Sequence, residues 1–120
     1  MLIRYINGDT KPQQIRYKIR LGLREYTIAF DIQELEDEQE NTQKYNWKEA
    51  TFSLGTPSYS DLVAAIIKGR YDDNNMAALI NNHLLNDGDE EHEAEWKSMQ
   101  EWRVEAKQLA KTILDELNTK

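Results

Sequence analysis

The spacing of apolar residues changes once along this chain, and that change limits the possible folds more than any other feature. Up to about residue 54, apolar and polar residues alternate, which is the two-residue period of a half-buried strand. From about residue 58 to the end, apolar residues recur every three or four positions, as they do along one face of a helix. The sequence therefore predicts strands first and helices after.

Residues 15–21 and 26–32 are the clearest strands, because apolar and polar residues alternate in both. Only Gly22–Glu25 separates them, which is short enough for an antiparallel hairpin. Residues 2–6 are expected to add an edge strand. Residues 36–44 are charged and without period, which indicates a solvated loop.

A further strand is predicted between Tyr45 and Leu54, but its apolar residues change parity along the way. Tyr45 and Trp47 share one parity, whereas Ala50 and Phe52 share the other. A strand of this kind needs a bulge, or it consists of two short pieces.

Three helices are expected after Pro57. Ser58 and Asp61 resemble a capping box for the first. Asp72 or Asp73 can cap the second, and Gly88 is expected to end it. The second helix has an apolar stripe of Met76, Leu79, Ile80, His83 and Leu84. The third begins in the acidic run at residues 89–91 and extends for about 25 residues, with a stripe of Trp96, Met99, Trp102, Ala106, Leu109, Ala110, Ile113 and Leu117.

The predicted fold class is α+β: a three- to four-stranded antiparallel sheet followed by three helices, the last one long. A length of 120 residues suits a single α+β domain over residues 1–120. We expect the helices to pack on one face of the sheet.

Composition excludes several classes of protein. The chain has no cysteine, which removes disulfide scaffolds and thiolate chemistry. No stretch approaches the roughly 20 apolar residues of a membrane span, and the first residues are too polar for a signal peptide. We therefore expect a cytoplasmic protein, or a virion-associated one if the chain is phage-derived. The formal net charge of −7 disfavours a polyanionic partner at long range.

One strand nevertheless has a basic face, formed by Arg16, Lys18 and Arg20. Such a face can hold nucleic acid through phosphate contacts. It can equally be a solvated face whose cations pair with acids on the neighbouring strand, such as Glu25 and Asp31. We favour the second interpretation because of the net negative charge.

Recognisable catalytic and metal motifs are absent from the sequence. His83 and His92 are the only histidines, and zinc sites need several convergent ligands. The acidic residues from Asp87 onward do not fit a calcium loop, because His92 stands where that loop needs glycine. We predict no catalytic residue, no metal and no cofactor. An enzyme would need a polar pocket that gathers His83 with carboxylates.

Two tryptophans of the third predicted helix are candidates for partner binding. Trp96 and Trp102 are six residues apart, so they do not lie on quite the same helix face. One of them can be core while the other anchors a partner, or both can be core. Trp96, Trp102 and Arg103 are therefore our candidate partner-binding residues.

Residues 59–84 also resemble a family of small, mostly uncharacterised proteins found in phages and prophages of gut Bacteroidetes. The resemblance rests on Ile66–Asp73, where a helix ends in an Ile-Ile-basic-Tyr pattern, and on Met76–Asn82. Looser similarity is found in Asp31–Glu34, Glu101–Arg103 and Ala106–Lys107. This chain has Gly69 at a position where the family commonly has a small residue such as alanine. The resemblance implies a mobile-element protein, in the context of tail or host-contact genes, and supplies no catalytic residues.

These observations favour a non-enzymatic protein-interaction or assembly module, and the resemblance implies a phage or prophage origin. Its partner would be another protein or a second copy, bound at the long helix or at an unpaired sheet edge. The alternative is a small nucleic-acid-binding or regulatory domain that uses Arg16, Lys18 and Arg20. We expect neither a membrane nor a small-molecule ligand.

Overall fold

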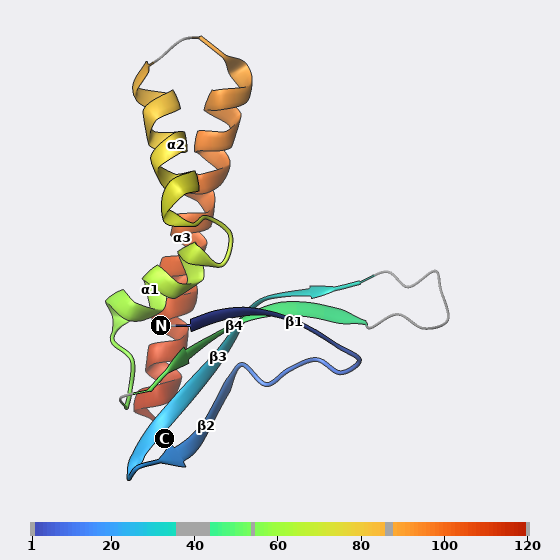
Figure 1. Ribbon diagram of the computed structural model, residues 1–120, viewed down its shortest axis with the longest axis vertical. Coiled ribbons are helices and arrows are strands. Elements are labelled where there is room, and N and C mark those ends of the chain that lie inside the picture. The colour runs from blue at the N-terminus through green and yellow to red at the C-terminus, as the bar shows by residue number, and fades with distance from the viewer. Residues whose placement is uncertain (1, 36–43, 54, 86–87, 120) are drawn as a thin grey trace. The chain divides into compact units, whose positions relative to one another are not determined.

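A computed structural model describes residues 2–35, 44–53, 55–85 and 88–119. Within these residues, four strands precede three helices, which confirms the predicted α+β fold class (Figure 1). The elements are β1 (Leu2–Gly8), β2 (Ile15–Arg20), β3 (Leu23–Glu34), β4 (Tyr45–Phe52), α1 (Tyr59–Lys68), α2 (Asp73–Leu85) and α3 (Glu90–Asn118). The chain divides into two compact units, Met1–Ser58 with Thr119–Lys120, and Tyr59–Asn118. One domain over residues 1–120, with helices packed on the sheet, stays a prediction.

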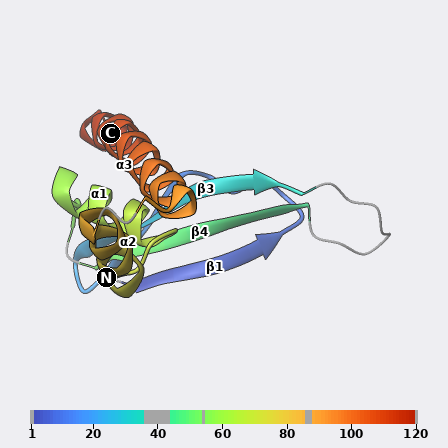
Figure 2. The same cartoon turned by 90° about the horizontal axis from the view of Figure 1, so that it is seen from above.

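The first unit is an antiparallel sheet with strand order β1-β4-β3-β2, so β1 and β2 are its edges. Figure 2 shows β1, β4 and β3 side by side. The predicted hairpin is confirmed, but its turn is shorter than expected, because β3 begins at Leu23. Leu21 and Gly22 both have positive φ, 53° and 79°, as a two-residue turn between right-twisted strands requires. The solvated loop predicted over residues 36–44 lies almost wholly outside the described residues.

The apolar residues of β4 change parity along the strand, but not because β4 contains a bulge. β4 is one regular strand, and the irregularity lies in β3 between Phe30 and Gln33. Asp31 has a φ of 51° there, and β3 holds one residue more than β4 over the same stretch. Trp47 breaks the expected pattern because it shares the polar face of the sheet with Glu49, where its indole N–H finds an acceptor.

Alternation and register give the sheet one apolar and one polar face. Tyr26, Ile28, Phe30 and Ala50 are buried on the apolar face. Arg16 and Lys18 of β2 lie on the polar face, on the same side as their cross-strand partners Thr27 and Glu25. The basic strand face predicted from the sequence is therefore a real face of the sheet.

The second unit consists of three helices. Asp72 accepts a hydrogen bond from the backbone N–H of Asn75 at 2.7 Å and so caps α2, and Asp89 caps α3 through the N–H of Glu91 at 2.9 Å. α3 has 29 residues, somewhat more than predicted. Its buried residues are Met99, Trp102, Ala106, Ala110, Ile113 and Leu117, all from the predicted stripe.

The stripe predicted for α2 is covered only in part. Leu79 is buried and Met76 and His83 are half-buried, whereas Ile80 is 38% and Leu84 72% exposed. α2 lies beside the first half of α3 (Figure 1), and a single neighbouring helix covers only part of its apolar surface. An exposed apolar strip therefore remains on α2.

Candidate functional sites

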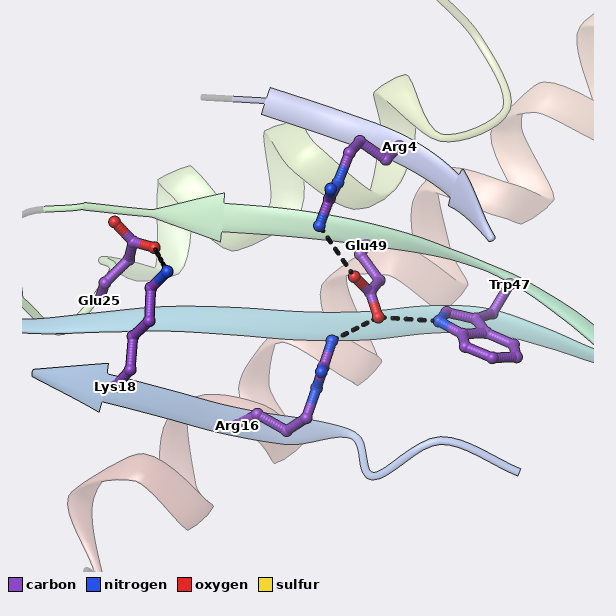
Figure 3. A network of polar contacts seen from close by, with 6 residues as sticks. All are labelled: Arg4, Arg16, Lys18, Glu25, Trp47 and Glu49. Atoms are coloured by element: carbon purple, nitrogen blue, oxygen red, sulfur yellow. Dashed lines mark hydrogen bonds and ion pairs between the residues drawn. The ribbon is translucent and has the colours of Figure 1, made fainter. Parts of the chain in front are cut away.

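A buried carboxylate, Glu49 on β4, organises the polar face of the sheet (Figure 3). Arg16 donates from Nη2 to Glu49 Oε1 at 2.5 Å, and the indole N–H of Trp47 donates to the same oxygen at 3.0 Å. Nη2 of Arg4, the cross-strand partner of Glu49 on β1, lies 3.6 Å from Oε2. Both oxygens are thus engaged, as a buried carboxylate needs.

A second carboxylate, Glu25 on β3, has a similar role further along β2. Lys18 Nζ lies 3.5 Å from Glu25 Oε1, and Arg20 Nη1 lies 3.3 Å from Oε2. Lys18 and Glu25 are direct cross-strand partners. Of the two predicted acidic partners, Glu25 is confirmed. Asp31 is not, because it lies at the bulge and pairs with Lys48 at 2.6 Å instead.

The four cations are far more exposed than the two acids they contact. Their side chains are between 47% and 70% exposed, whereas those of Glu49 and Glu25 are 5% and 8% exposed. Between them lies a depression of about 340 Å³. It is lined by Arg4, Arg16, Tyr17, Lys18, Glu25, Thr27 and Thr51. This face therefore presents more positive than negative charge to solvent, in a chain that is acidic as a whole.

The central member of this network, Glu49, was not predicted from the sequence. Arg16, Lys18 and Arg20 were predicted from their alternation along the strand. The sequence feature that could have indicated Glu49 is the Trp-x-Glu pattern. Trp47 and Glu49 are two residues apart and therefore share a face of their strand.

Arg24 is outside the depression, on the opposite face of β3. Its guanidinium lies 4.5 Å from the centre of the Tyr17 ring and donates to the Tyr26 hydroxyl at 3.2 Å. The hydrogen bond with Tyr26 raises the pKa of Arg24. Arg24 is thus held by aromatic residues rather than by an acid.

In the helical unit, Trp102 belongs to the core. Its side chain is buried, its indole N–H donates to the carbonyl of Ile66 at 3.1 Å, and the guanidinium of Arg70 covers its ring at 3.7 Å. The Ile66 carbonyl lies near the end of α1, where the backbone acceptors begin to lose intrahelical partners. Trp102 therefore ties α1 to α3 and leaves little ring for a partner to contact.

Trp96 lies on a different side of α3, as its six-residue separation from Trp102 predicts. It is half-buried and stacks on His83 of α2, with ring centres 4.0 Å apart and planes only 4° from parallel. Nδ1 of His83 also lies 3.4 Å from Glu93 Oε2. Arg103, seven residues after Trp96, is half-buried on the same side.

A groove of about 500 Å³ runs between α2 and α3. It is lined by Arg70, Tyr71, Asn75, Ala78, Leu79, Asn82, Glu91, Ala94, Glu95 and Ser98. His83 lines neither this groove nor the depression on the sheet, so neither brings together the histidine and carboxylates that the enzyme alternative requires. Among the described residues, no group of three or more histidine, aspartate or glutamate side chains is arranged to hold a metal ion.

No helix in the described part of the chain combines the length and the apolar character needed to cross a membrane. The comparisons give no family to this chain: no family model matches it, and neither a curated protein nor a solved structure matches it. The resemblance to phage and prophage proteins consequently stays a prediction, as do the roles of Trp96, Trp102, Arg103, Arg16, Lys18 and Arg20.

Proposed function

We propose that this chain is a non-enzymatic assembly module in which two copies associate through one side of α3. The observation that carries the proposal is a stripe whose spacing reads the same in both directions. Its members are Glu93, Trp96, Gln100, Val104 and Lys107, separated by three, four, four and three residues. Residues at these separations lie along one side of a helix.

The stripe is complementary to its own reverse. In an antiparallel pair of α3 helices centred on Gln100, Trp96 of one copy lies opposite Val104 of the other. At each end, Glu93 lies opposite Lys107. A two-fold axis requires a surface that matches itself in this way, with apolar residues meeting apolar residues and acids meeting bases. The two central Gln100 amides can donate to and accept from each other.

The stripe is accessible in the single chain. Trp96 and Gln100 are half-buried, Val104 is 55% exposed, and Glu93 and Lys107 are exposed. Burying a valine of this kind contributes up to about 1.5–3 kcal/mol, whereas an exposed ion pair contributes about 0–1 kcal/mol. Apolar contacts would thus supply the affinity, and the Glu93–Lys107 pairs would select the antiparallel orientation.

Apolar surface continues from this stripe onto α2. His83, which stacks on Trp96, is followed directly by the exposed Leu84, and Ile80 lies one turn before Leu84 on the same side. Adjacent exposed apolar residues on two helices are typical of an interaction surface. The phage-like resemblance implies a mobile-element protein in the context of tail or host-contact genes, which is consistent with this proposal.

The test is the oligomeric state of charge-reversal variants, measured by sedimentation equilibrium over a concentration series. Glu93→Lys and Lys107→Glu each place like charges opposite one another in the antiparallel pair, so each should weaken association by about two- to fivefold per contact. The double variant restores both pairs with reversed sign and should regain association. A parallel arrangement would not predict this rescue, because Glu93 would then lie opposite Glu93.

Glu101→Lys is the matched control, because Glu101 is exposed on another side of α3 and the charge change equals that of Glu93→Lys. Val104→Glu should abolish association without unfolding the chain. A wild-type chain that sediments as a monomer at all concentrations would overturn the proposal. Salt-sensitive binding of DNA or RNA that is lost in an Arg16→Gln, Lys18→Gln double variant would instead favour the nucleic-acid alternative.

A further inference from the structure

The polar face of the sheet brings together cations that are far apart in the sequence. Arg4 comes from the edge strand β1, and Arg16 and Lys18 come from the opposite edge strand β2. In Figure 3, Arg4 and Arg16 point toward each other from these two edges, and Glu49 lies between them. All three cations line one depression.

From this arrangement we propose that the depression binds one compact oxyanion of the phosphate class. The site lies on the sheet and does not depend on the association of α3. Its volume of about 340 Å³ has room for a single small group of this kind. Thr27 and Thr51, which are cross-strand partners, add two hydroxyl donors to the lining.

The charge of the site suits a dianion. Arg4, Arg16 and Lys18 of the lining contribute three positive charges and Glu25 contributes one negative charge. The neighbouring Arg20 and Glu49, which lie outside the lining, add one charge of each sign. Two positive charges therefore remain after the carboxylates are neutralised. Arg16 reaches Glu49 through Nη2, and a guanidinium carries further N–H groups that can donate to a bound oxygen.

Glu49 acts as a positioning residue in this proposal. Its carboxylate accepts a hydrogen bond from the Trp47 indole and one from the Arg16 guanidinium, and so holds that guanidinium at the depression. An arginine that is already fixed loses less conformational freedom when an anion binds. Ion pairing that served stability alone would not need two exposed cations over each buried acid.

The experiment is a titration of the full chain with inorganic phosphate and with pyrophosphate at low ionic strength, followed by two-dimensional NMR of the backbone amides. We expect saturable shifts confined to residues around Arg16, Thr27 and Thr51. Arg16→Gln should weaken phosphate binding about tenfold or more, as loss of a charged hydrogen-bond donor predicts. Lys111→Gln, an equal charge change at an exposed position of α3, should leave the affinity within about twofold.

The Glu49→Gln variant distinguishes a site whose arginine is held in position by Glu49 from a site that attracts phosphate by its net charge alone. It makes the face more positive, so a purely electrostatic site would bind phosphate more tightly, whereas a positioned site binds it more weakly. We expect the weaker binding. If Glu49→Gln does not fold, Thr27→Val and Thr51→Val remove the hydroxyl donors without a charge change and should each weaken phosphate binding.

Three outcomes would overturn the proposal. Sodium chloride at matched ionic strength could produce the same shifts as phosphate. Phosphate could produce none. A single-stranded oligonucleotide could bind across β2 while inorganic phosphate does not, which would indicate a polymer-binding face in place of a small-anion site.

Discussion

The guanidinium of Arg16 lies 2.5 Å from the carboxylate of Glu49, although β3 separates their two strands. The arginine can cross β3 because the positions beneath it carry small side chains. Thr27 lies opposite Arg16, and Ala29 lies opposite Glu49. Ala29 is completely buried, so a larger residue there would compete with the arginine for space.

Removal of the Glu49 carboxylate should destabilise the sheet. In Glu49→Ala, the buried Trp47 loses the acceptor for its indole N–H, which costs about 1–3 kcal/mol. Glu25→Ala is the comparison, because Glu25 binds two exposed cations, and its loss should cost about 0–1 kcal/mol. Urea unfolding measures both. Equal losses would show that the buried indole contact adds nothing.

The two tryptophans of α3 should differ in their contribution to stability. Trp102→Phe keeps an aromatic ring but removes the hydrogen bond to the Ile66 carbonyl, and we expect a loss of about 1–3 kcal/mol. Trp96→Phe retains most of the ring stacking on His83 and should cost less than about 1 kcal/mol. Thermal unfolding followed by far-UV circular dichroism makes the comparison. The reverse order would contradict the assignment of Trp102 to the core.

The hairpin turn offers a stabilising substitution. Leu21 has a φ of 53° and is almost fully exposed, so its side chain costs backbone strain and makes little packing contact. Leu21→Asn creates an Asn-Gly turn, which should stabilise the chain by about 0.5–1 kcal/mol. Gly22→Ala at a φ of 79° should act in the opposite direction. An unfolding midpoint that falls in Leu21→Asn would refute the strain argument.

Gly8 should be intolerant of a side chain for a steric reason. A Cβ at this position would lie 2.7 Å from Cη2 of Trp47, so the indole must move. Gly8→Ala should therefore cost about 1–3 kcal/mol and shift the indole N–H resonance of Trp47, which reports its bond to Glu49. Asn7→Ala, at the adjacent exposed residue, should leave that resonance in place.

Most of the secondary structure follows from local periodicity. Alternation found β2 and β3, and the buried residues of α3 all belong to its predicted stripe. Trp47 shows where this reasoning fails, since its parity, opposite to that of Ala50, was explained by a bulge or a break in the strand. A tryptophan has a polar N–H, and a buried acceptor can hold it on either face of a sheet.

The failures at α2 and Asp31 have a different origin. Ile80 and Leu84 fit a helical stripe, but burial depends on how many neighbouring elements a helix has, which its own sequence does not encode. Asp31 was expected to pair with the basic strand from its parity, and one extra residue in β3 changed its direction. The cations of the basic face could thus be predicted from their own strand. The role of Glu49 could not, because it depends on contacts between residues of three different strands.

The basic residues of β2 have a further consequence, because β2 is an edge of the sheet. An edge strand exposes unpaired backbone groups that can template aggregation with a second molecule. Two β2 strands aligned antiparallel would bring Arg16, Lys18 and Arg20 of each chain against cations of the other. Lys18 and Arg20 share the single carboxylate of Glu25, so the acids beneath these cations neutralise only part of their charge. Like-charge repulsion therefore protects this edge from fibre-like stacking, even though Tyr17 and Ile19 lie exposed on its other face.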